Sequence, residues 1–160
     1  LNDYRYFIYL DYINNHPEIE NIFMTDGNDV TVINNPFKFI KNKNIYVGTE
    51  PNKLEKEKQY FNNKFKILNS GNKKYIQKPN IYYNAGILGG TRKIVLKFLS
   101  EMVKIFNNLD NNLLTKNLNM PIFNHVCNKY FYNNNITGSP LHSIFKEYQN
   151  YRKDVYFIHK

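Results

Sequence analysis

The sequence predicts an α/β fold with a mixed, mostly parallel sheet flanked by helices. Short apolar runs rich in Ile, Val, Phe and Tyr alternate along the chain with longer stretches of helical periodicity, which is typical of this class. The 160 residues contain no internal repeat and no stretch with the composition of a domain linker. We therefore expect one domain over residues 1–160, with a core of its own.

The first half of the chain gives four elements. Apolar residues at helical spacing predict a helix over residues 1–14, and Pro17 prevents it from continuing. A nearly continuous apolar run predicts a buried strand over residues 19–24. β-Branched and aromatic residues predict further strands over residues 30–33 and 45–48.

The second half begins with a polar region. Residues 51–78 predict a solvated helix followed by a mobile loop, with an acceptor-binding lid as the alternative. A strand over residues 81–90, interrupted and closed by glycine, leads into an amphipathic helix that Thr91 can cap. Another helix is predicted over residues 121–132 and a final strand over residues 155–158.

The composition is biased in one direction. The chain has 28 Asn, and its 19 Lys far outnumber its 3 Arg, which indicates an AT-rich genome such as that of a virus or a protist. The net charge of +9 would suit an anionic partner such as a nucleic acid. The lysines are spread along the chain rather than clustered, however, so we expect no nucleic-acid partner.

The single cysteine, Cys127, excludes an intramolecular disulfide and a cysteine-rich zinc site. No apolar run is long enough to span a membrane, so we expect no membrane span in this chain. The expected location is the cytoplasm, meaning the host cytoplasm if the protein is viral. The lumen of the secretory pathway is the alternative if an upstream anchor has been removed.

Two carboxylates follow the first predicted strand. Asp26 and Asp29 would be delivered to its carboxyl end, where α/β proteins bind ligands. Gly27 would allow a tight turn that aims both carboxylates at one divalent cation, and oxygen ligands prefer Mn²⁺ or Mg²⁺. A hydrogen-bonded turn without a metal is the alternative, because Asp-Gly-Asn-Asp is also ordinary turn chemistry.

Two further segments carry candidate site residues. The glycine-rich segment from Asn84 to Gly90 allows close approach of a ligand, although tight strand–helix packing would use the same glycines. His159 could be a third metal ligand, and the ammonium of Lys160 could offset phosphate charge. A polar chain end without function is the alternative for these two residues.

Taken together, these features resemble nucleotide-sugar glycosyltransferases of the GT-A fold. The Asp-x-x-Asp-Val spacing after the apolar strand is similar to that in the glycosyltransferase domains attached to collagen lysyl hydroxylases. The resemblance runs from about Arg5 to Lys160. It implies that the chain is the C-terminal majority of a larger domain, without the first strand–helix unit that holds the nucleobase.

The resemblance also implies roles for particular residues. Asp26 would contact the ribose or the metal, Asp29 would bind metal and diphosphate, and His159 would be the late metal ligand. The candidate donor- and acceptor-binding residues are Asp26, Asn84, Ala85, Gly86, Gly89, Gly90 and Lys160.

The expected function is therefore metal-dependent transfer of a sugar from a nucleoside diphosphate, most simply UDP, to a hydroxyl acceptor. Glu50 and Asp110 are the candidates for a catalytic base, and their poor placement favours a retaining mechanism. The first alternative is a non-catalytic binding or interaction module with the same fold. The second is a basic nucleic-acid-binding protein.

Overall fold

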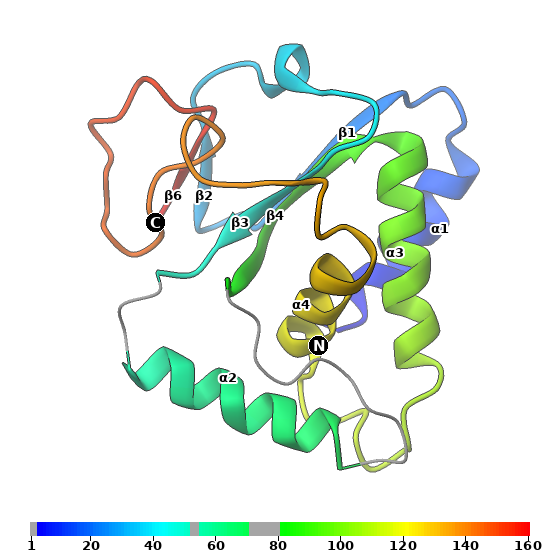
Figure 1. Ribbon diagram of the computed structural model, residues 1–160. Helices are drawn as coiled ribbons and strands as arrows, with labels where there is room; N and C mark the ends of the chain where they lie inside the picture. The colour runs from blue at the N-terminus through cyan, green and yellow to red at the C-terminus, as the bar shows by residue number, and fades with distance from the viewer. Residues whose placement is uncertain (1–2, 52–54, 71–80) are drawn as a thin grey trace.

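A four-stranded sheet with one long central strand organises the molecule (Figure 1). The computed structural model describes residues 3–51, 55–70 and 81–160. Its elements are α1 (Arg5–Asn15), β1 (Asn21–Thr25), β2 (Val30–Val32), the 3₁₀ helix η1 (Pro36–Phe39), β3 (Ile45–Thr49), α2 (Glu55–Leu68), β4 (Tyr83–Thr91), α3 (Arg92–Phe106), α4 (Asn119–Tyr130), β5 (Asn135–Ile136) and β6 (Phe157–His159). The α/β class and the mixed sheet flanked by helices are confirmed.

The strand order in this sheet is β1-β4-β3-β5. Strand β4 is antiparallel to both β1 and β3, and only the pair β3–β5 is parallel. The expectation of a mostly parallel sheet is therefore wrong. A continuous apolar run predicts that a strand is buried on both faces, but it does not fix the direction of that strand.

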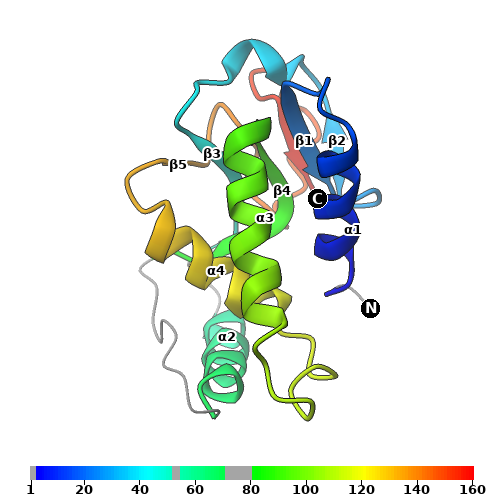
Figure 2. The same ribbon diagram turned by 90° about the vertical axis from the view of Figure 1, so that its right-hand side faces the viewer.

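The two faces of the sheet bury different clusters of side chains. Along β3, Ile45 and Val47 belong to the larger core beneath the helices, whereas Tyr46 between them joins a smaller core that contains Phe157. Figure 2 shows α1 and α3 side by side over the first face. The second face is closed by η1 and by a two-stranded antiparallel sheet of β2 and β6.

The helices follow the predicted pattern with small shifts of their ends. The buried stripe of α3 consists of Val95, Phe98, Leu99, Met102, Ile105 and Phe106. Thr91 makes no side-chain capping hydrogen bond, which corrects the expectation that it caps this helix. Instead, the first amide of α3, on Arg92, donates to the carbonyl oxygen of Glu20 at 2.7 Å.

The polar region from residue 51 to residue 78 contains α2, as expected, but the loop predicted after it lies mainly outside the described residues. No helix in the described part of the chain is both long enough and apolar enough to cross a membrane.

Candidate functional site

A polar cavity of about 480 Å³ lies where β1 and β3 end and β4 begins. Because β4 runs against both of its neighbours, its first residues lie beside the last residues of theirs. The cavity is lined by Arg5, Asp26, Gly27, Asn28, Asp29, Glu50, Tyr60, Phe61, Asn84, Ala85, Gly86, Asn117, Asn119 and Met120. It thus brings together residues that lie up to 115 positions apart in the sequence, from Arg5 to Met120.

The two aspartates of the predicted motif both line this cavity. The amide of Asp26 donates to the carbonyl oxygen of Gly86 at 3.0 Å, and the carbonyl of Asp26 accepts from Val30 at 3.2 Å to close the turn. Asp29 is exposed, and Gly27 has no left-handed backbone and open space around its Cα. The tight turn therefore does not require glycine at position 27, contrary to the expectation.

A guanidinium that the sequence analysis missed lies beside Asp26. Arg5, the first residue of α1, forms an ion pair with the Asp26 carboxylate and donates to the hydroxyl of Tyr6 at 3.2 Å. Burial disfavours the charge of Arg5, but Tyr6 and Asp26 outweigh it, so the pKa of the guanidinium is raised. Because the chain has 19 Lys and only 3 Arg, the choice of arginine at position 5 was a sequence signal for a specific ion pair or phosphate contact.

Glu50 and Asn84 form a buried hydrogen-bonded pair in the lining of the cavity. The Asn84 side-chain amide donates to Glu50 Oε1 at 2.6 Å, and Asn84 Oδ1 accepts from the Gly86 amide at 2.6 Å. The Glu50 carboxylate therefore orients Asn84. Asp110, the other candidate base, is exposed in the loop after α3 and does not line the cavity.

His159 is buried directly behind Gly86. A Cβ on Gly86 would lie 2.8 Å from His159 Nε2 and 2.9 Å from Asn84 Oδ1, so only glycine fits between these atoms. The ring packs against Phe145 in a tilted arrangement, with 4.2 Å between ring centroids. Burial lowers the pKa of His159 to about 4, with His142 adding to the shift, so the imidazole is neutral near pH 7.

The end of the chain is tied to the aspartate turn. Strand β6 pairs with β2 so that His159 lies opposite Val30, and the amide of Lys160 donates to the carbonyl oxygen of Asp29 at 2.7 Å. Neither His159 nor Lys160 is among the residues that line the cavity. The backbone thus places both residues beside the motif, while their side chains lie outside the cavity wall.

The expected metal ligands do not form one closed group. Within the described ranges, no three side chains of His, Cys, Asp or Glu come close enough to hold one ion. Arg5 pairs with Asp26, and His159 packs behind Gly86. The donor chemistry still suits a hard cation, because the carboxylates of Asp26 and Asp29 both line the cavity.

Gly89 and Gly90 were expected to line a ligand site, but they lie at the far end of β4 and not at the cavity. A Cβ on Gly89 would lie 2.1 Å from Phe23 Cδ1, and a Cβ on Gly90 would lie 3.0 Å from the Asn44 carbonyl oxygen. These two glycines therefore allow tight packing of β4 against its neighbours, which is the alternative given for this segment. Asn84, Ala85 and Gly86 remain the part of the segment that reaches the cavity.

Asn119 is a second residue that the sequence analysis missed. It begins α4, is buried and lines the cavity. Its backbone amide donates to Asp3 Oδ1 at 3.0 Å. No sequence signal pointed to it, because it is one of 28 Asn.

The fold and this cavity define an α/β protein with an acidic pocket at the end of a mixed sheet. The chain matches no protein-family model, and no curated protein is significantly similar to it in sequence.

Proposed function

We propose that the protein is a metal-dependent sugar transferase that uses a nucleoside-diphosphate sugar and a hydroxyl acceptor. One observation carries the proposal. Among the described residues that line the cavity, Asp26, Asp29 and Glu50 supply three carboxylates and Arg5 the single cationic side chain, although the protein has a net charge of +9. Such a local excess of negative charge favours a bound cation.

The residues present fit a hard divalent cation such as Mn²⁺ or Mg²⁺. Asp26 and Asp29 would hold it, and the neutral imidazole of His159 behind Gly86 is the candidate nitrogen ligand. When bound, such an ion neutralises the diphosphate that leaves as the glycosidic bond to the nucleotide breaks.

The protein's own groups have separate tasks in this proposal. Arg5 would bind a phosphate oxygen through N–H groups at the edge of its planar guanidinium, as arginine does with phosphate groups. Asn84, oriented by Glu50, would fix hydroxyl groups of the sugar beside Gly86, which also lines the cavity. Lys160 would add positive charge beside the Asp29 end of the cavity.

The direct test is titration calorimetry of UDP with and without Mn²⁺, together with donor hydrolysis assays. We expect UDP to bind only with the metal, and Asp29→Asn to abolish both binding and hydrolysis. Asp110→Asn is the matched control, because it removes an exposed carboxylate outside the cavity. The proposal is ruled out if UDP binds equally well without Mn²⁺, or if the Asp29→Asn protein still hydrolyses the donor.

A non-catalytic binding module is the second candidate. The ion pair between Arg5 and Asp26 favours it, because a carboxylate already neutralised by a guanidinium binds a metal less strongly. This candidate predicts that nucleotide binds without any donor turnover and without dependence on Mn²⁺.

A further inference from the structure

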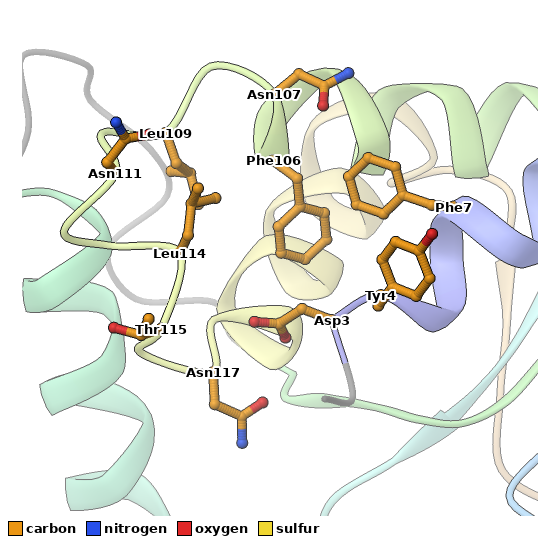
Figure 3. Close-up of a pocket in the computed structure, with 10 residues that line it drawn as sticks. All are labelled: Asp3, Tyr4, Phe7, Phe106, Asn107, Leu109, Asn111, Leu114, Thr115 and Asn117. Atoms are coloured by element: carbon orange, nitrogen blue, oxygen red, sulfur yellow. The ribbon is translucent and has the colours of Figure 1, made fainter.

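A second cavity lies on the other side of the first turn of α1. It has a volume of about 630 Å³ and is bounded by the start of α1, the end of α3 and the loop that leads to α4. Figure 3 shows the rings of Tyr4, Phe7 and Phe106 on one side, and the side chains of Leu109 and Leu114 on the other. The cavity is thus a slot with an aromatic wall.

The aromatic wall has an exposed outer part and a buried floor. Tyr4 is 64% exposed and stacks on Phe7 with 5.9 Å between ring centroids. Phe7 in turn contacts Phe106, which is only 3% exposed. The wall therefore offers an apolar aromatic surface that a ligand can cover.

The rest of the lining is polar but almost uncharged. Asn107, Asn111 and Asn117 are exposed along it, and their side-chain amides form no hydrogen bond within the described chain. Asp3 is the one charged side chain in the described lining, in a protein with 22 Lys and Arg. An anionic ligand would meet only a carboxylate here, so the cavity suits a neutral ligand.

This second cavity adjoins the candidate functional site. Asn117 lines both cavities, with a left-handed backbone (φ 53°) that asparagine tolerates better than most residues. The Asp3 carboxylate, which lines the second cavity, accepts hydrogen bonds from the amides of Leu118 and Asn119, at 3.3 and 3.0 Å. Asn119 then lines the first cavity, so one short wall separates the two.

We propose that the second cavity binds a neutral sugar residue of the acceptor. A pyranose ring presents a face of C–H groups that packs on an aromatic surface, and hydroxyl groups at its edge that pair with amides. Tyr4 and Phe7 provide the surface, and the three asparagines provide donors and acceptors. The assignment to the acceptor rests on the proposed function, whereas the sugar chemistry rests on this cavity alone.

The test is saturation-transfer NMR on the whole chain, without metal or nucleotide. The probes are lactose, maltotriose, cellotriose and chitotriose. We expect saturation transfer to at least one of them, and about tenfold weaker binding after Tyr4→Ala, which removes the outer ring of the wall. Tyr132→Ala is the matched control, because Tyr132 is 66% exposed and lines neither cavity.

A second variant guards against a folding defect. Asn117→Gly keeps the left-handed backbone available and removes only the amide, so it should fold and bind the same sugar more weakly. No transfer to any probe, or unchanged affinity in both variants, overturns the inference. If the unmodified protein binds a sugar and the two variants bind it more weakly, but no UDP binds with Mn²⁺, the proposed function fails and the sugar site stands.

Discussion

Arg5, the first residue of α1, and Asp26, the residue after β1, form an ion pair in the lining of the acidic cavity. The pair joins a helix to the end of a strand 21 positions further along the chain. It also gives Asp26 a partner that competes with any metal ion, so Arg5 controls how much negative charge the cavity offers.

Replacing Arg5 should therefore have opposite effects on two ligands. We expect Arg5→Gln to strengthen the binding of Mn²⁺ alone, because Asp26 loses its competing cation. The same change should weaken the binding of UDP in the presence of Mn²⁺ by about tenfold, because a charge-assisted hydrogen bond to phosphate is lost. Titration calorimetry measures both.

The control for Arg5 is an arginine in a similar pair elsewhere. Arg152 binds Asp154 at the protein surface, outside the cavity, so Arg152→Gln should leave both affinities unchanged. If Arg5→Gln shifts the two affinities in the same direction, Arg5 does not have the proposed double role.

Gly86 should not tolerate a side chain. Its Cβ would lie within 3 Å of both His159 Nε2 and Asn84 Oδ1, so Gly86→Ala must displace a buried imidazole or a buried amide. We expect a loss of about 1–3 kcal/mol in the free energy of unfolding, measured by urea denaturation. Gly27→Ala is the control, because nothing lies within 4 Å of a Cβ there. Equal stability of the two variants would show that the His159 ring can move aside freely.

Gly89 should matter for packing and not for ligands. Gly89→Ala places a methyl group against the ring of Phe23, at 2.1 Å from Cδ1, and we expect a loss of about 1–3 kcal/mol in stability. Phe23→Leu in the same protein should recover part of the loss, because it removes the opposing ring. Absence of any recovery in the double variant would contradict a direct contact as the cause.

The pH dependence of stability should follow the buried histidines. Burial lowers the pKa of His125 to about 4, from an ordinary value of 6.5, and Lys129 adds to the shift. Because the folded pKa is lower than the unfolded one, the stabilisation is complete above pH 6.5 and is lost as the pH falls towards 4.

Urea denaturation at pH 7 and at acid pH tests this dependence. His125→Gln cannot be protonated, so the variant should lose less stability on acidification than the unmodified protein. His16→Gln, at a partly exposed histidine that pairs with Glu18, is the control and should lose as much stability on acidification as the unmodified protein. An unchanged slope in the His125 variant would mean that other groups cause the acid effect.

The sequence alone determined the elements and part of the site. Helical periodicity located α3 and a nearly continuous apolar run located β1, because apolar side chains must be buried whatever their partner. Asp26, Asp29 and Asn84 could be named because they follow or begin strands, and strand ends meet at one edge of a sheet. Glycines at positions 86 and 89 looked alike in the sequence, and both allow close approach of another group.

Only the tertiary structure separated those two glycines, because one meets an imidazole beside the cavity and the other meets a phenyl ring in the core. It also showed that β4 runs antiparallel to both β1 and β3, because local composition does not encode the direction of a strand. The position of Arg5 beside Asp26 depends in the same way on how α1 packs against α3 and the sheet. Local patterns fix what each segment buries, whereas long-range packing decides which polar groups meet.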